Sequence, residues 1–188
     1  INKNMSLTPS NMLSLGTIAP NFNLPNTISD KNNSLDELKG SEGTLIMFIC
    51  NHCPYVKHIN STIANLANLY HGNKINFIAI SSNDVINYPE DSPELMKEMA
   101  LENNFNFPYL YDESQEVAKN YDAACTPDFY LFDSSLELVY RGQIDDSRPG
   151  NNIKSDGSDI KNAIDCLLNK KINQRLQKPS IGCNIKWK

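Results

Sequence analysis

The sequence predicts an α/β fold, in which a layered β-sheet carries helices on both of its faces. Short β-rich apolar runs, such as residues 45–50, are typical of strands that are buried on both sides. These runs alternate with segments whose apolar residues recur at helical spacing. Strands that alternate with helices along the chain predict a layered α/β arrangement.

The first elements surround the longest apolar run. Residues 17–26 alternate apolar and polar side chains between two prolines, which predicts a short edge strand. Residues 34–38 predict one capped helical turn that ends at Gly40. Residues 44–50 predict a central buried strand, and helical spacing after Pro54 predicts a long helix directly behind it.

The rest of the chain continues the alternation. Residues 75–80 predict a second buried strand, and Ser92 with Pro93 predicts the start of a helix, as an N-cap and a first-turn proline. The later elements are a short strand at 109–111, a short helix at 114–121, a hairpin of strands at 129–132 and 138–141 near the end of the sheet, and an amphipathic helix at 158–168.

The length of 188 residues predicts one domain over residues 1–188, with an N-terminal arm at 1–16 and a C-terminal tail at 169–188. The longest apolar run is far too short to cross a bilayer, and the first residues contain no apolar stretch of signal-peptide length. We therefore expect a cytoplasmic location and no membrane partner.

The tail is basic, whereas the whole chain has a net charge of −5. Residues 169–188 contain six Lys or Arg and no acid, and such a stripe could contact an acidic partner or nucleic acid. No recognition motif and no interleaved aromatic residues accompany the charge. We therefore expect a solvated tail and no nucleic-acid partner.

The chemistry-bearing motif is Cys50-Asn51-His52-Cys53, at the transition from the central strand to the long helix. The unpaired N–H groups and the dipole of a helix N-terminus stabilise an anion, so we expect an exposed Cys50 thiolate with a lowered pKa. Cys53 would lie in the first helical turn, within reach of a disulfide. An imidazolium at His52 would favour the thiolate and make the disulfide a stronger oxidant.

Metal binding is the main rival to redox chemistry at this motif. A zinc site usually needs four ligands, and the sequence contains no second C-x-x-C and no paired histidines. A copper(I) site needs fewer soft ligands, so Cys50 and Cys53 with a histidine or Cys125 could form one. We assign no metal and no cofactor.

A second motif, Thr126-Pro127, stands just before the predicted hairpin, where a cis peptide bond would form a tight turn. Together the two motifs resemble the thioredoxin superfamily. The phrases that resemble its peroxiredoxin-like branch, the AhpC/TSA–redoxin group, are APNFNLP, FICNHCPYVKH, ACTPDFYLFD, VYRGQIDDSRPGN and PSIGCNIKWK. The resemblance implies a thioredoxin-like fold with a central mixed sheet, a cis Pro127, and a Thr126 backbone that receives the substrate.

The resemblance is incomplete at the site. Peroxiredoxins carry P-x-x-x-T-x-x-C, but on alignment at Cys53 this chain has Ile46 in place of the proline and Cys50 in place of the threonine. We therefore expect a thiol–disulfide oxidoreductase in which Cys50 attacks a protein or small-molecule disulfide and Cys53 resolves the mixed disulfide. The alternatives are a thiol peroxidase, in which Cys53 attacks a hydroperoxide, and a non-enzymatic copper(I) or zinc carrier.

Four other residues, three cysteines and one arginine, could act at the site or serve only the fold. Cys125 could relay a disulfide, ligate a metal, or be a small buried hydrophobic residue. Arg148 could supply positive charge near the sulfurs, or it could form a salt bridge within its loop. Cys183 could resolve a disulfide from the tail, although Ile185 and Trp187 favour packing of the tail onto the domain. Cys166 occupies a position of the last predicted helix that faces the protein core, and we expect it to be chemically inert.

Overall fold

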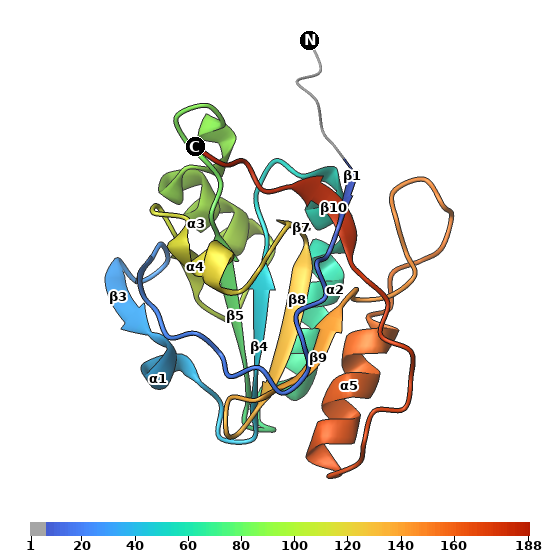
Figure 1. The fold of residues 1–188 in the computed structure, drawn as a ribbon. Coiled ribbons are helices and arrows are strands. Elements are labelled where there is room, and N and C mark those ends of the chain that lie inside the picture. Colours follow the sequence, from blue (N-terminus) through green and yellow to red (C-terminus); the bar gives the residue numbers. More distant parts are fainter. Residues whose placement is uncertain (1–6) are drawn as a thin grey trace.

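The computed structural model describes residues 7–188, and a seven-stranded sheet forms its centre (Figure 1). The strand order is β3-β2-β6-β5-β4-β8-β9. Its members are β2 (Asn23–Asn26), β3 (Lys31–Ser34), β4 (Gly43–Phe48), β5 (Ile75–Ser81), β6 (Tyr109–Tyr111), β8 (Asp128–Asp133) and β9 (Leu138–Gly142).

The sheet is mixed, as the sequence predicts. Strand β4 pairs in parallel with β5 and antiparallel with β8, and β8 forms the terminal hairpin with β9. Every residue of β4 is buried, which agrees with the continuous apolar run at its position. The C-terminal end of this central strand leads directly into the cysteine motif.

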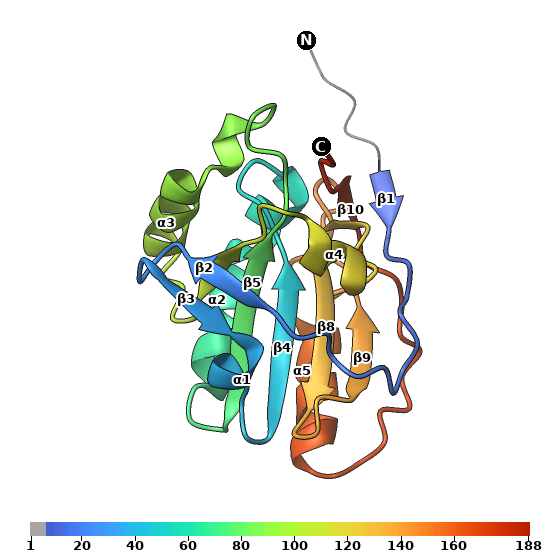
Figure 2. The same cartoon turned by 60° about the vertical axis from the view of Figure 1, so that its left-hand side comes forward.

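Within residues 7–188, five α-helices and one short 3-10 helix cover the two faces of the sheet (Figure 2). Alternate side chains of β4 point to opposite faces. Leu45 and Met47 pack with α2, α3 and α5, whereas Ile46 and Phe48 pack with α1 and α4. The helices are α1 (Leu35–Leu38), α2 (Pro54–Tyr70), η1 (Pro89–Asp91), α3 (Pro93–Glu102), α4 (Glu116–Asn120) and α5 (Ser158–Leu168).

Local sequence signals explain where several helices begin. Ser34 and Glu37 form a capping box at α1, because each side chain bonds the backbone N–H of the other. Ser92 caps α3, and a proline occupies its first turn. These features confirm the predicted helix starts.

A second sheet of three strands, in the order β1-β10-β7, lies beside the main sheet (Figures 1 and 2). Its strands are β1 (Leu7–Pro9), β10 (Ile181–Asn184) and β7 (Cys125–Thr126). Strand β10 lies between the other two, so the N-terminal arm and the C-terminal tail meet at the loop before Pro127. Residues 1–6 of the predicted arm lie outside the described residues.

Two sequence predictions about the fold are wrong. Residues 17–26 do not form one edge strand, because only Asn23–Asn26 is a strand and the polar strand β3 pairs with it on the outside. The prediction of a solvated tail is wrong at Ile185 and Lys186, which are 1% and 4% exposed. The predicted packing of Ile185 onto the domain is confirmed, whereas Trp187 is 42% exposed. Strand β10 forms because its backbone has partners on both sides, which the polar and basic composition of the tail did not indicate.

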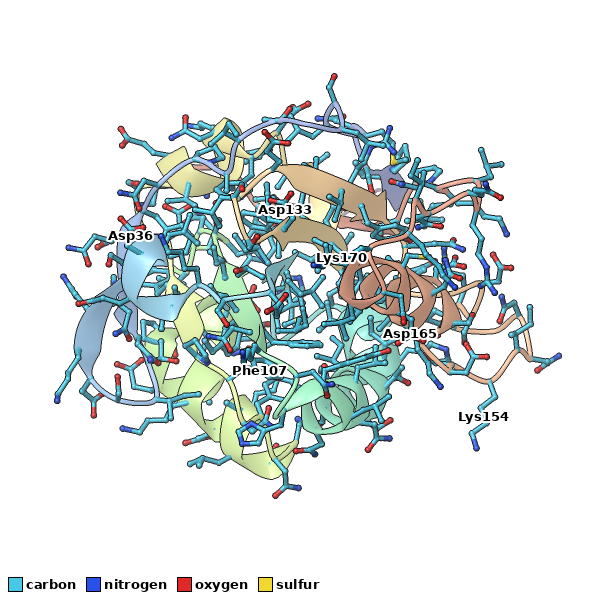
Figure 3. All side chains as sticks on the ribbon, turned by 90° about the horizontal axis from the view of Figure 1, so that it is seen from below. Asp36, Phe107, Asp133, Lys154, Asp165 and Lys170 are labelled. Atoms are coloured by element: carbon cyan, nitrogen blue, oxygen red, sulfur yellow. The ribbon has the colours of Figure 1, made fainter. Side chains whose placement is uncertain are left out.

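The end of the molecule opposite the cysteine motif is built from turns and helix ends. Figure 3 shows this end from below, with Asp133 at the end of β8 and Lys170 beyond the end of α5. Across residues 7–188, none of the helices has both the length and the apolar character that crossing a bilayer requires.

Candidate active site

The two cysteines of the motif are fully buried. Cys50 lies in the loop after β4, and Cys53 is the N-cap residue of α2, with Pro54 as its first helical residue. Each residue is 0% exposed, and none of the five cysteines of the chain is in a disulfide. The prediction that Cys50 is exposed to solvent is therefore wrong. Its sulfur lies inside the protein, 3.2 Å from the hydroxyl of Thr126.

Cys53 has the sulfur environment that favours a thiolate. The Sγ atom of Cys183 lies 2.7 Å from its Sγ atom. Hydrogen bonds from Cys183, from Cys50 and from the backbone N–H of Val56 lower the pKa of Cys53 well below its ordinary value. The protonated form of Cys53 donates a hydrogen bond to the carbonyl oxygen of Thr126, 3.3 Å away.

Cys50 has the opposite electrostatics. Burial raises the pKa of its thiol well above the ordinary value, and the neighbouring Cys53 and Asp91 charges raise it further. The hydroxyl of Thr126, at 3.2 Å from its sulfur, is the one group that favours the thiolate. The expected lowered pKa of Cys50 is thus corrected: the helix N-cap position belongs to Cys53, so the positive end of the helix dipole acts on that sulfur.

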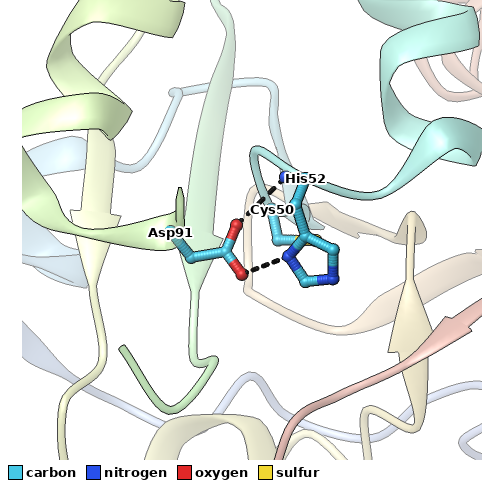
Figure 4. A group of neighbouring side chains, drawn as sticks. All are labelled: Cys50, His52 and Asp91. Carbon is cyan, nitrogen blue, oxygen red and sulfur yellow. Dashed lines mark hydrogen bonds and ion pairs between the residues drawn. The ribbon is translucent and has the colours of Figure 1, made fainter. Parts of the chain in front are cut away.

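His52 is held by a carboxylate that the sequence analysis did not single out. Its Nδ1 atom lies 2.6 Å from Oδ2 of Asp91, a residue of η1 that is 0% exposed (Figure 4). The hydrogen bond with Asp91 raises the pKa of His52, although burial acts against it. His52 also stacks on Tyr88, with ring centroids 5.5 Å apart.

Asp91 also fixes the backbone of the cysteine loop. Its Oδ1 atom accepts the backbone N–H groups of Asn51 and His52, at 2.7 and 3.1 Å. Its Oδ2 atom accepts a further hydrogen bond from Asn83, at 2.8 Å. These bonds, above all the one from His52, lower the pKa of Asp91 despite its burial. A buried acid seldom lacks a partner, but nothing in the sequence pairs Asp91 with this loop.

The second motif adopts the expected turn. The Thr126–Pro127 peptide bond is cis, and Thr126 contacts both sulfurs of the first motif, through its hydroxyl to Cys50 and through its carbonyl to Cys53. The structure therefore brings Thr126 and Pro127 against Cys50 and Cys53. It also brings Cys183 there, from β10, which pairs with Thr126 in antiparallel register.

Cys125 and Arg148, whose roles the sequence leaves open, do not join the sulfur cluster. The thiol of Cys125 lies 3.7 Å from the carbonyl oxygen of Pro127, and burial raises its pKa, so it has the character of a small buried residue. The guanidinium of Arg148 donates to the carbonyl oxygens of Asp145 and Ser147 and to the side chain of Gln143. Arg148 thus organises its own loop.

Cys50, His52 and Asp91 form the one group of described residues whose ligand atoms converge as a metal site requires, all within 4.8 Å of one another. The donor set suits a metal poorly. Both oxygens of Asp91 already accept two hydrogen bonds each. The raised pKa of Cys50 keeps its thiol protonated, whereas metals bind the thiolate. The His52 Nε2 atom, which has no hydrogen-bond partner in the described structure, would be the only ready ligand.

Comparison with solved structures identifies proteins that share this fold. An uncharacterized conserved protein from Geobacillus kaustophilus is 55% identical, with 98% of each chain covered and a TM-score of 0.96. A hypothetical protein from Sinorhizobium meliloti is 44% identical, with 96% of this chain and 98% of that chain covered and a TM-score of 0.93. The thioredoxin domain of a thiol-disulfide oxidoreductase from Bacteroides vulgatus shares the fold at 16% identity, with 79% of this chain and 96% of that chain covered and a TM-score of 0.61.

The comparison with curated proteins found no match. A family model matches residues 15–141, which include both motifs and most of the main sheet. The fold is thioredoxin-like, and the chemistry shared by the family and its structural neighbours is thiol redox chemistry. The chain belongs to the AhpC/TSA family.

Proposed function

We propose that this protein is a thiol–disulfide oxidoreductase in which Cys53 is the nucleophile. The observation that carries the proposal is the environment of Cys53, at the start of α2 and beside the cis Pro127, with thiol and N–H donors that lower its pKa. A thiolate, not a thiol, attacks a disulfide. This order of the two sulfurs is the reverse of the one predicted from the sequence.

The reaction begins when the Cys53 thiolate attacks one sulfur of a substrate disulfide. A mixed disulfide forms, and the other substrate sulfur leaves as a thiolate. A second thiol of this chain then attacks the sulfur of Cys53 and releases the remaining half of the substrate. Cys50, three residues before Cys53, is placed for this second step, with Thr126 Oγ1 as a hydrogen-bond donor to its developing thiolate.

The substrate class is a protein or small-molecule disulfide. The tail gives no support to a nucleic-acid role: Lys178 pairs with Asp146 at 2.7 Å, and Lys186 is buried, with its ammonium over the ring of Tyr88. We keep the cytoplasmic location that the sequence predicts as part of the proposal.

A thiol peroxidase is the second candidate, since the lowered pKa of Cys53 would equally serve attack on a hydroperoxide. Peroxide cleavage also needs donors that stabilise the leaving oxygen. The Thr126 hydroxyl points at Cys50, and the bonds of Arg148 go to its own loop. The disulfide reaction therefore has the better-equipped site.

Rapid mixing of the reduced protein with glutathione disulfide, and separately with hydrogen peroxide, tests the proposal. We expect saturable oxidation by the disulfide, lost in Cys53→Ser and unchanged in the control Cys166→Ser, whose thiol lies on α5. Peroxide oxidation that is faster than disulfide oxidation at equal concentration would favour the peroxidase. Full disulfide reactivity in Cys53→Ser would remove Cys53 from the mechanism.

A further inference from the structure

The C-terminal tail lies against the sulfur cluster in the manner of a bound peptide. Strand β10 pairs antiparallel with β7, and Cys183 lies opposite Thr126, the residue before the cis Pro127. The backbone N–H of Ile185 donates to the carbonyl of Ala124, which extends the pairing by one residue. A peptide strand paired in this register carries its cysteine directly to Cys53.

The close approach of β10 depends on a glycine. A Cβ atom at Gly182 would lie 2.0 Å from the carbonyl oxygen of Thr126 and 3.1 Å from Cδ of Pro127. Ser180 adds an anchor, because its hydroxyl donates to the carbonyl of Pro127 and its backbone N–H donates to the hydroxyl of Ser10. The tail is therefore fitted to this loop.

The fit also encloses the sulfurs. Cys50 and Cys53 are 0% exposed and Cys183 is 3% exposed. An external disulfide can reach Cys53 only when β10 moves aside. When β10 returns, the first group that meets a modified Cys53 is the thiol of Cys183, whose sulfur lies 2.7 Å from that of Cys53 in the reduced protein.

We propose that Cys183 is a resolving cysteine for Cys53, and that β10 acts as a substrate strand supplied by the chain itself. This inference rests on the proposed function. After Cys53 has formed a mixed disulfide, the Cys183 sulfur attacks the sulfur of Cys53. The Cys53–Cys183 bond forms, the bond from Cys53 to the substrate breaks, and the substrate leaves as a thiolate that takes up the proton lost by Cys183. The substrate disulfide gains two electrons, and Cys53 and Cys183 lose them.

The electrostatics of the pair fit this order of events. In the reduced protein the hydrogen bond to Cys53 is the main cause of the raised pKa of Cys183, and burial is the second cause. The proton therefore stays on Cys183 and the negative charge on Cys53. Once Cys53 has reacted, its negative charge is gone and that hydrogen bond no longer holds the proton. Cys183 then becomes easier to deprotonate at the moment when it must attack.

The test separates Cys183 from Cys50 by using variants of the full chain. Reduced Cys50→Ser is mixed with one equivalent of glutathione disulfide, quenched with N-ethylmaleimide and digested with trypsin. Cleavage after Lys and Arg, except before Pro179, leaves Cys53 in peptide 40–57, Cys183 in peptide 176–186 and Cys125 in peptide 120–141. We expect a disulfide between the first two peptides and release of both glutathione molecules.

The matched comparison replaces one further cysteine. In Cys50→Ser/Cys183→Ser we expect a stable glutathione adduct on Cys53, with release of the second glutathione slowed at least about tenfold, because no external thiol in the assay matches the effective concentration of one in the same chain. Cys50→Ser/Cys166→Ser has the same number of substitutions and should behave like Cys50→Ser.

The remaining outcomes distinguish failure of the role of Cys183 from failure of the proposed function. A glutathione adduct on Cys53 that persists in Cys50→Ser, with Cys183 still a thiol, would overturn the role of Cys183 and leave the proposed function standing. Absence of any adduct or disulfide at Cys53 in all variants would overturn both. If the double variant does not fold, as judged by circular dichroism, the peptide map of Cys50→Ser alone still gives the answer.

Discussion

Nδ1 of His52 lies 2.6 Å from Oδ2 of Asp91, and this contact joins the cysteine loop to the 3-10 helix η1. The same carboxylate accepts the backbone N–H groups of Asn51 and His52. Asp91 thus sets both the charge of the imidazole and the path of the backbone between the two cysteines. The imidazole that the sequence places beside the sulfurs is paired with this acid.

Replacing Asp91 by Asn should therefore lower the pKa of His52. The raised pKa of His52 means that its pairing contributes stability below the unfolded histidine pKa and loses it as pH rises through the folded pKa. Asp91→Asn should abolish that dependence and cost roughly 2 kcal/mol at acidic to neutral pH, in the range for hydrogen bonds to charged groups. Titration of the imidazole by NMR and urea unfolding measure both effects. Glu90→Gln makes an equal change of charge at the exposed neighbour of Asp91, and it should change neither the pKa of His52 nor the stability of the protein.

The thiolate of Cys53 should be visible in the reduced protein at neutral pH. Because its pKa is lowered, its contribution to stability is complete above the unfolded cysteine pKa and is lost as pH falls through the folded pKa. Thiolate absorbance in the ultraviolet should therefore persist in acid well below the ordinary cysteine range, remain in Cys50→Ser and vanish in Cys53→Ser. Absorbance that disappears with Cys50 instead would restore the order predicted from the sequence.

A methyl group at Gly182 should displace the tail. Since the added Cβ would meet the backbone of Thr126 at 2.0 Å, Gly182→Ala should destabilise the protein by about 1–3 kcal/mol, as overpacking does. It should also speed alkylation of Cys53 by iodoacetamide, because β10 covers that sulfur. Gly72→Ala is the control, as a Cβ there meets no atom within 4 Å. Equal alkylation rates in the two variants would show that β10 does not limit access.

Asp128 should make stability depend on pH near neutrality. Burial raises its pKa to about 7, so the protonated acid is favoured in the folded state, and stability falls as pH rises from the unfolded carboxyl pKa through about 7. Asp128→Asn should remove that loss, on the order of a few kcal/mol. Urea unfolding from pH 4 to 9 measures it. Asp30→Asn, at an exposed position whose charge does not act on Asp128, should keep the wild-type profile.

Much of the main sheet follows from the sequence, because its strands are apolar runs. The predicted strands at 75–80 and 109–111 and the helix at 158–168 agree with β5, β6 and α5. Strands β3 and β10 escape prediction since Lys31–Ser34 and Ile181–Asn184 carry mostly polar or small side chains. Their backbones pair only because other strands are placed beside them, a tertiary effect that local propensity does not contain.

The site shows the same division. Cys50, Cys53 and the cis Pro127 are recognisable from their spacing and their neighbours. Asp91 and Cys183 lie 38 and 130 residues beyond Cys53 in the sequence, so local spacing does not link them to the motif. The sequence suggests Cys183 as a resolving cysteine only through its place on the tail, and it does not indicate Asp91. Burial is the main cause of the raised pKa of Cys50, and Asp91 raises it further. The hydrogen bond from Cys183 is the main cause of the lowered pKa of Cys53.

The central place of β10 in the three-stranded sheet has a consequence for the solubility of shortened forms of the chain. Strand β10 supplies partners to β1 on one side and to β7 on the other. A chain cut after Gln177 would leave both as open edges with unpaired N–H and C=O groups, and would uncover the apolar side chains of the core against which Ile185 packs. Unprotected edges recruit strands from other molecules. We therefore expect chains shortened in this way to associate edge to edge, and the complete tail to protect these edges.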